Sequence, residues 1–498
     1  MLDKQIISSS FFYTISKYLI LTFGFVRATF VALILSKNDM GELALIYLIL
    51  EYSSYLFSLG LPNSINLQAS IDKNYINSLN HNNQKIQKYY SIFFFILIVV
   101  CLIFYSLFFL STNFYGEFYK EIILNNYNEI FLIILLYSIK SFCNMHNRLW
   151  ENSFRLMLSD ITYSLLYLMG IIFLLDYNSD DPINIILQVI IFSQVCSIIV
   201  SNLKISSKHF ISFEKKHLKQ LFPIGVLLML QNMMELYFWG IDRLFISFYL
   251  IPENLALFHI AHTYGRGMMM FFAALTFLIY PRLITILSNE KISIRETKRV
   301  IDKAFSISET ILVLAFGFYI TFIPYLMNLI LKKYDNFFYI FSLILIGLII
   351  KNLTFFPVTF LISRKKQKKL ILSSFIFLII LVFLYQLLFT FEIIYNAEHF
   401  TSVAVIIFLF FSIFIFSWSM STLKQKKIHL LVINKFWRIS SLLLIFFYCY
   451  NSNFDQMSSI FIMIFSIIFI YFKSVLNSSK IIYSTISNIY LKNINKKI

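Results

Sequence analysis

Fourteen apolar segments constrain this 498-residue chain more than any other feature. Nearly all reach the roughly 20 residues that a helix needs to cross the hydrocarbon core of a bilayer. In that core each backbone polar group must be bonded within the protein, so each segment is predicted to be a transmembrane helix. The predicted spans are 11–35, 42–67, 89–111, 125–147, 161–178, 183–202, 221–249, 254–281, 305–331, 336–362, 370–391, 401–421, 428–449 and 457–478.

The composition excludes a soluble globular protein, because 59% of the residues are hydrophobic and only 13% are charged. The loops between the segments are short and leave no room for a soluble catalytic domain. We therefore expect an all-α polytopic membrane protein that is not an enzyme. The four cysteines lie in apolar segments without metal-ligand or disulfide-framework spacing, so neither a metal nor another cofactor is expected.

Lys and Arg residues are concentrated on one side of the predicted membrane. The run Arg364-Lys365-Lys366-Gln367-Lys368-Lys369 is typical of the inner loops, and the outer loops hold only Lys37, Lys120, Lys332 and Lys333. This asymmetry predicts that both termini are cytoplasmic. The net charge of +17 is then explained by contact with anionic membrane lipids, and not by nucleic-acid binding.

The two halves of the chain share a pattern of cations and turns. Arg27 is followed by an apolar run, a polar turn and a Leu-rich helix, and so is Arg243. Lys140 and Lys351 each lie in mid-span, with a further cation 15 residues later, at Arg155 and Lys366. This repeat predicts two six-helix bundles related by an axis along the membrane normal. The expected domains are a bundle over 1–203, a cytoplasmic linker over 204–220, a bundle over 221–421, and two additional helices with a tail over 422–498.

The hairpin from Lys219 to Leu283 carries ionisable residues inside two apolar spans, where charge is costly and usually faces protein or water. Its helical spacing and its turn near Ile251 place some of them at equal depth. Glu235 is predicted to lie level with Arg266, and Asp242 level with His259; His262 shares a helix face with the latter. These residues either pair structurally or line a transport path, and either role is consistent with the spacing.

Several motifs resemble those of the polysaccharide flippase family, within the superfamily that also holds the multidrug and toxin extrusion transporters. The small-residue turn is Asp39-Met40-Gly41, and the motif that ends the next helix is Ser58-Leu59-Gly60-Leu61-Pro62-Asn63-Ser64. The seventh helix carries Asp242-Arg243, and the eighth ends in Tyr280-Pro281-Arg282. The resemblance covers the first ten segments by motif and the last four by hydropathy alone.

The chain departs from the family pattern at Ala256 and Phe258, where Gly and Tyr are usual. Membership implies that the chain moves polyprenyl-diphosphate-linked oligosaccharide repeat units to the outer leaflet of a bacterial inner membrane, for capsule, O-antigen or another surface polysaccharide. The polymerase and other polysaccharide-assembly proteins are then potential partners.

Moving a diphosphate through a membrane requires compensating cations, since Arg and Lys bind phosphate through charge-assisted hydrogen bonds. The predicted substrate-binding residues are Arg27, Lys140, Arg243 and Lys351, and polar candidates for the sugar are Asn144, Asn352, Tyr52 and Tyr264. The candidates for ion coupling or structural pairing are Glu51, Glu235, Asp242, His259, His262 and Arg266. Arg27 also lies at the depth of Glu51, so an Arg27–Glu51 ion pair is the structural alternative.

Two other functions are compatible with a polytopic chain. A drug or cation antiporter of the same superfamily would favour acids in its cavity, whereas here cations outnumber acids within the spans. A membrane glycosyltransferase or polymerase would require a sizeable outer loop with catalytic residues, and the loop with Asp180 and Asp181 is only a few residues long.

Overall fold

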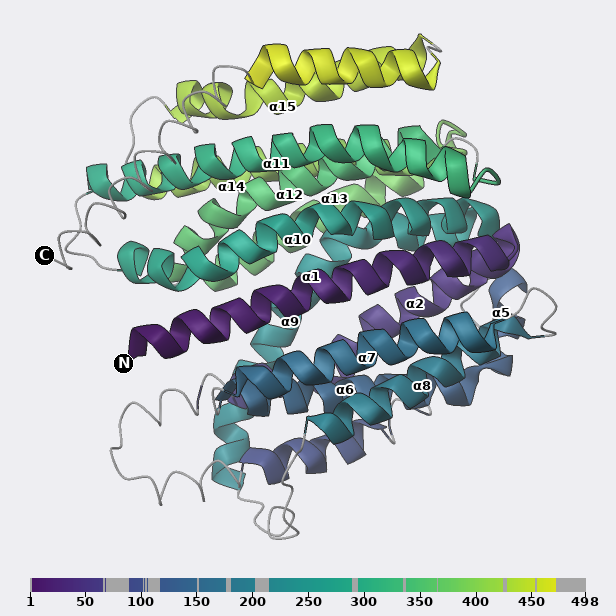
Figure 1. The fold of residues 1–498 in the computed structure, drawn as a ribbon. Coiled ribbons are helices and arrows are strands. Elements are labelled where there is room, and N and C mark those ends of the chain that lie inside the picture. Colours follow the sequence, from purple (N-terminus) through teal and green to yellow (C-terminus); the bar gives the residue numbers. More distant parts are fainter. Residues whose placement is uncertain are drawn as a thin grey trace, which may run out of the picture. The chain divides into compact units, whose positions relative to one another are not determined.

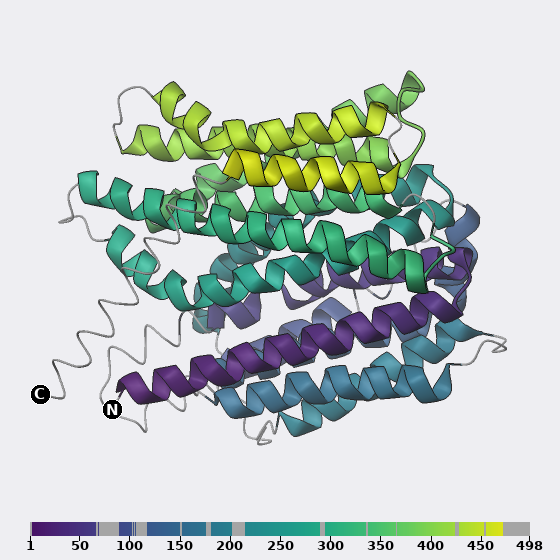
Figure 2. The ribbon, with the colours of Figure 1, turned by 45° about the horizontal axis from the view of Figure 1, so that its top comes forward.

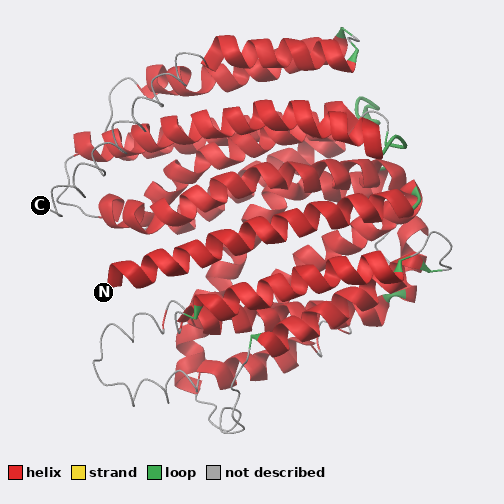
Figure 3. Ribbon diagram, viewed as in Figure 1, coloured by secondary structure: helices red, strands yellow, loops and turns green. Residues whose placement is uncertain are grey.

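The computed structural model describes residues 2–65, 68, 89–101, 103, 105, 117–149, 152–175, 181–201, 215–288, 294–334, 337–364, 366–423, 428–452 and 455–471. Within these ranges all regular elements are helices, and no strand occurs (Figure 3). A helix lies in each of the fourteen predicted spans, which confirms the all-α fold. By length and hydropathy, eight described helices qualify as membrane spans, or nine if a bent pair counts as one; the number fourteen stays a prediction.

The chain divides into two compact units, the first over Met1–Ile260 and the second over Ala261–Ile498. Figure 1 labels the helices. Those of the first unit are α1 (Leu2–Ile34), α2 (Lys37–Ser58), Tyr89–Cys101, α5 (Glu117–Asn125), α6 (Tyr127–Leu149), α7 (Ser153–Leu174), α8 (Pro182–Val200) and α9 (Lys215–Tyr249). Those of the second unit are α11 (Ile294–Ile330), α12 (Phe337–Ser363), α13 (Gln367–Thr390), α14 (Ala397–Thr422), α15 (Ile428–Asn451) and Gln456–Tyr471. Helix α10 (Pro252–Ser288) belongs to both.

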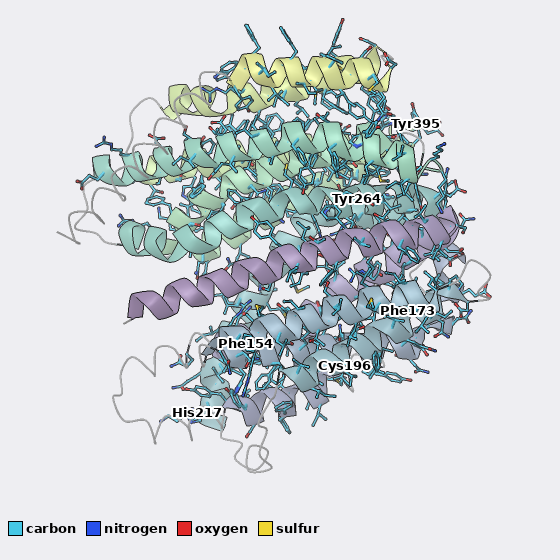
Figure 4. All side chains as sticks on the ribbon, in the orientation of Figure 1. Phe154, Phe173, Cys196, His217, Tyr264 and Tyr395 are labelled. Atoms are coloured by element: carbon cyan, nitrogen blue, oxygen red, sulfur yellow. The ribbon has the colours of Figure 1, made fainter. Side chains whose placement is uncertain are left out.

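In the first unit α7 packs against α1 and α8 (Figures 1 and 2). Ser159 of α7 and Ser197 of α8 bond reciprocally, each hydroxyl donating to the other residue's carbonyl at 2.9 Å. Phe173, near the end of α7 (labelled in Figure 4), is 73% exposed, as expected for a lipid-facing residue. A small polar contact thus joins α7 to α8, while an apolar side chain of α7 lies on the outside.

Helix α2 begins and ends at residues suited to those positions. Ser36 caps it, since its hydroxyl accepts from the Asp39 amide at 3.1 Å while the Asp39 carboxylate accepts from the Ser36 amide at 3.3 Å. At its other end Leu59 and Gly60 have φ of 46° and 64°. Such left-handed residues stop a helix and suit glycine. The motif quoted above for Ser58 to Ser64 is therefore, locally, a helix terminus.

The second unit is built around α12. In its apolar stretch 83% of the residues are buried, against 22% in α13. Helices α11 and α14 pack on α12, and α13 packs on α14 with one face left exposed. A nearly continuous apolar sequence therefore forms a core helix in α12, and a lipid-facing helix in α13.

The boundary between the two units lies after α9 and within α10. Helix α9 packs against α2 and therefore groups with the helices that precede it. It also bends by 49° between Lys216–Met234 and Leu236–Tyr249. The predicted division into bundles over 1–203 and 221–421, and the two-fold repeat, stay predictions.

Candidate functional site

Arg27 lies on α1 in a cluster of tyrosines from three helices. Its guanidinium carbon is 3.9 Å from the centroid of the Tyr167 ring. Three further tyrosines surround this ring: Tyr47 bonds to the Tyr167 hydroxyl, Tyr163 lies 5.9 Å from Tyr167 between ring centroids, and Tyr137 bonds to Tyr163. We call these four residues, Tyr47 of α2, Tyr137 of α6, and Tyr163 and Tyr167 of α7, the tyrosine cage. A guanidinium above an aromatic face is attracted by the negative face of the ring.

The hydroxyls of the tyrosine cage are bonded in two pairs. Tyr47 pairs with Tyr167, and Tyr137 with Tyr163 at 3.2 Å. Each hydroxyl has one hydrogen to donate, so in each pair one O–H is used and one remains available. The cage can therefore offer two further donors beside the N–H groups of Arg27.

Lys140 of α6 extends the cage by one cation. Its ammonium nitrogen lies 4.1 Å from the Tyr163 ring centroid and 3.5 Å from Oδ1 of Asp160 on α7. The Lys140 side chain is 10% exposed and that of Asp160 13%. Its charge is therefore balanced by a carboxylate within the same unit.

Arg27 differs from Lys140 because it has no such acid. Among the residues that the structure describes, no carboxylate lies within ion-pair distance of its guanidinium. The Arg27–Glu51 alternative raised from the sequence is therefore wrong. The physical reason is that Glu51 is held by another arginine.

That arginine is Arg243 of α9. Its Nη1 donates to Oε2 of Glu51 on α2 at 2.9 Å, and the residue is 5% exposed. Its Nε is buried without a hydrogen-bond partner. Beside it, Tyr52 donates to the Gly240 carbonyl at 3.1 Å and stacks on Tyr237 at 4.5 Å. Arg243, one of the predicted substrate ligands, is thus tied to a carboxylate between two helices.

Backbone contacts extend this α2–α9 seam in both directions. A Cβ on Gly60 would lie 2.2 Å from the Gly225 carbonyl oxygen, so only glycine permits this approach. At the start of α2, a Cβ on Gly41 would lie 2.1 Å from the Pro252 carbonyl oxygen, at the start of α10. These contacts and the Glu51–Arg243 pair join α2 to the α9–α10 hairpin along its length.

The remaining predicted ionisable residues lie in varied surroundings. Asp242 is 5% exposed and accepts from the Arg243 backbone amide at 3.0 Å. His259 stacks on Tyr47 at 5.4 Å, which joins α10 to the tyrosine cage. Arg266 is exposed, whereas His262 and Lys351 are half-buried. The Glu235 side chain lies outside the described residues, so its predicted pairing stays untested.

The four polar residues predicted to meet the sugar take part in packing. Tyr52 is in the α2–α9 seam, and Tyr264 is buried against Phe337 at 6.4 Å (Figure 4). Asn352 donates to the Leu348 carbonyl at 2.8 Å. The side-chain oxygen of Asn144 is buried without a hydrogen-bond partner.

The tyrosine cage was not predicted from the sequence, although one signal for it was present. Asp160, Tyr163 and Tyr167 stand at i, i+3 and i+7 and therefore share one face of a helix. Nothing in the sequence relates that face to Arg27. A partly buried pair in the second unit was not predicted either: Nη1 of Arg438 lies 3.4 Å from the Glu309 carboxylate.

No metal site emerges from the part of the chain that the structure describes, since no three His, Cys, Asp or Glu side chains come together there. The site therefore offers cations, hydroxyls and aromatic faces. These groups bind anions and sugars through hydrogen bonds and stacking.

Comparison with known proteins identifies the family. The sequence model of a family described as "Polysaccharide biosynthesis protein" matches residues 6–287, which is more than half of the chain. The chain belongs to this family. No sequence among curated proteins matches it.

Two solved structures share the fold of this family member. An inward-facing multidrug resistance MATE transporter of the MOP superfamily superposes with a TM-score of 0.65 at 11% identity, over 83% of this chain and 99% of the other. The lipid II flippase MurJ in an inward closed conformation gives a TM-score of 0.58 at 16% identity, over 96% and 99%. The chain is a multi-pass membrane protein with a transporter fold, as expected from its sequence.

Proposed function

We propose that this chain is a flippase for polyprenyl-diphosphate-linked oligosaccharide repeat units. It moves them from the cytoplasmic to the outer leaflet of a bacterial inner membrane, for surface polysaccharide biosynthesis. The observation that carries the proposal is Arg27, a cation within a membrane span that contacts tyrosines and has no acid partner among the described residues. Such a charge is costly in a membrane unless a ligand compensates it.

A diphosphate is the ligand whose chemistry matches this site. It carries negative charge and accepts hydrogen bonds, and the cage offers the Arg27 N–H groups together with one free O–H from each tyrosine pair. Aromatic faces and hydroxyls at the same place suit an attached sugar. The lipid tail has no need of the site, because it can remain in the bilayer.

Lys140 is proposed as the second cation for the diphosphate. It is 3.5 Å from Asp160, so a phosphate oxygen would compete with that carboxylate. Competition of this kind keeps binding reversible, which a transporter requires. Arg243 would have to exchange Glu51 for substrate in the same way, and Lys351 is proposed as the counterpart of Lys140 in the second unit.

Family membership and the transporter fold support this proposal. The family is one of polysaccharide biosynthesis, and the fold is shared with a protein described as a lipid II flippase. We further propose alternating access by movement of the two units, both termini in the cytoplasm, and assembly with a polymerase. The proposed residues for ion coupling or structural pairing remain Glu51, Glu235, Asp242, His259, His262 and Arg266.

The test is export of lipid-linked oligosaccharide by protein reconstituted in liposomes. Arg27→Ala should lower the initial rate about tenfold to hundredfold, the equivalent of one charge-assisted hydrogen bond. Arg27→Lys should retain part of the activity because it keeps the charge. Arg299→Ala, at an exposed cation outside the predicted spans, is the control and should export normally.

Two results would contradict the proposal. One is normal export by Arg27→Ala. The other is wild-type protein that moves a cationic drug against a gradient and leaves the lipid-linked oligosaccharide in its original leaflet, which would support the antiporter instead.

A further inference from the structure

Helix α10 has different partners along its length. Its first residues contact the first unit, where Pro252 meets Gly41 and His259 stacks on Tyr47 at 5.4 Å. All of these contacts are with α2. Residues 252–259 of α10 therefore pack against α2, which carries Tyr47 of the tyrosine cage.

From Tyr264 onward, the partner of α10 is α12 of the second unit. Tyr264 packs edge-on against Phe337, Met269 receives a contact from Asn352, and Phe272 packs against Phe355 at 5.8 Å. A Cβ on Gly265 would lie 3.1 Å from the Ile344 side chain, so this approach is close. Among these contacts of the described residues, the last with α2 is at His259 and the first with α12 is at Tyr264.

The boundary between the compact units, Ile260/Ala261, lies in this same stretch. A boundary usually falls in a loop, whereas here it falls inside an uninterrupted helix. Any motion of one unit relative to the other must therefore be accommodated within α10.

The sequence at this point suits bending. The stretch Thr263-Tyr264-Gly265-Arg266-Gly267 holds two of the eleven glycines of the whole chain within three residues. Glycine and threonine are both weaker helix formers than alanine. A helix is expected to bend most readily where such residues are gathered.

We propose that residues 260–267 of α10 are the hinge of this transporter. Residues 252–259 of α10 move with the first unit and the remainder of α10 moves with α12. The helix bends between these two parts during each transport cycle. The inference rests on the proposed function only in requiring that the two units move.

Hydrogen exchange on the wild-type protein in lipid nanodiscs is the first test. Amides of 261–267 should exchange several-fold faster than those of 253–259 and 268–275 in the same helix. Protection equal to that of both flanks would overturn the proposal, without any variant being made.

A stiffened variant provides the second test. Thr263→Ala with Gly267→Ala raises helix propensity, and each change should favour the straight helix up to about fivefold. The matched control is Gly317→Ala with Thr321→Ala in α11, where a Cβ on Gly317 meets only one atom, at 3.9 Å. Export by the hinge variant should fall several-fold, and export by the control should not.

Spin labels at Leu165 of α7 and Phe383 of α13, both exposed, report the distance between units in a cysteine-free background. The hinge variant should narrow the distance distribution relative to the control, whatever substrate is carried. If the hinge variant shows the same distance distribution and the same export as the control variant, the hinge proposal is wrong. Narrowing without export of lipid-linked oligosaccharide by the wild type would retain the hinge and reject the flippase. If the hinge variant does not fold, hydrogen exchange in the wild type decides.

Discussion

Arg27 and Arg243 were predicted from the sequence to be equivalent cations of two repeats, yet their surroundings differ. Arg243 is 5% exposed and bonds Glu51 at 2.9 Å between α2 and α9. Arg27 lies 3.9 Å above Tyr167 and, among the described residues, has no carboxylate beside it. Within the described part of the chain, a carboxylate neutralises the charge of Arg243, and none neutralises that of Arg27.

The difference shows how a structural ion pair can be distinguished from a substrate-binding residue in a membrane protein. A buried ion pair is expensive to break, because removing one partner leaves the other charge uncompensated. An arginine over aromatic rings has no acid that depends on it. The two arginines should therefore respond differently to loss of charge: stability should fall most at Arg243, and transport should fall without a large loss of stability at Arg27.

The largest expected effect is at the α2–α9 seam. Arg243→Ala should lower the free energy of unfolding by about 3–5 kcal/mol, since it removes the arginine that compensates the Glu51 charge within the membrane. Arg243→Met combined with Glu51→Met should recover most of this loss. Denaturant unfolding in detergent measures the free energy of unfolding of both variants. If Arg243→Ala lowers it no more than Arg299→Ala does, the Arg243–Glu51 pair does not stabilise the fold.

A smaller effect is expected from the glycines of the same seam. Gly60→Ala should cost about 2 kcal/mol, because Gly60 has φ of 64° and its added Cβ would lie 2.2 Å from the Gly225 carbonyl oxygen. Gly24→Ala is the control, since a Cβ there meets nothing within 4 Å. Equal unfolding midpoints for the two variants would mean that α2 and α9 are not in close contact.

Arg27→Met should change stability by only about 1 kcal/mol, the size of a cation–π contact. The same variant should lose most of its export. Unfolding and export measured on one preparation sharpen the comparison with Arg243. Severe destabilisation by Arg27→Met would show that Arg27 is a structural residue as well.

The smallest effect is expected at Tyr167. Tyr167→Phe keeps the ring beneath Arg27 and removes only the hydroxyl bonded to Tyr47, which should cost about 0.5 kcal/mol. Thermal unfolding should change little, whereas export should fall if the Tyr167 hydroxyl itself donates to the diphosphate. Export equal to wild type would show that the Tyr167 hydroxyl is not the donor, because the Tyr47 O–H remains available in this variant.

Much of the fold followed from the sequence because a membrane leaves few choices. Apolar runs long enough to span must bond their own backbones, and helices lie in all fourteen predicted segments. The capping residue Ser36 and the terminus at Gly60 are likewise local. The predicted cations Arg27, Lys140 and Arg243 do lie inside helices, as expected from hydropathy.

Tertiary structure alone decided which partner each cation has. Hydropathy and helical spacing fix depth and face, but residues at one depth on several helices remain equally possible partners. Equal depth in the membrane predicted that Glu51 would pair with Arg27. Instead, the packing of α2 against α9 pairs Glu51 with Arg243, and the packing of α7 against α1 places Tyr167 beneath Arg27. The packing of α10 is a similar case. The sequence of a continuous apolar helix does not show which of its residues contact α2 and which contact α12.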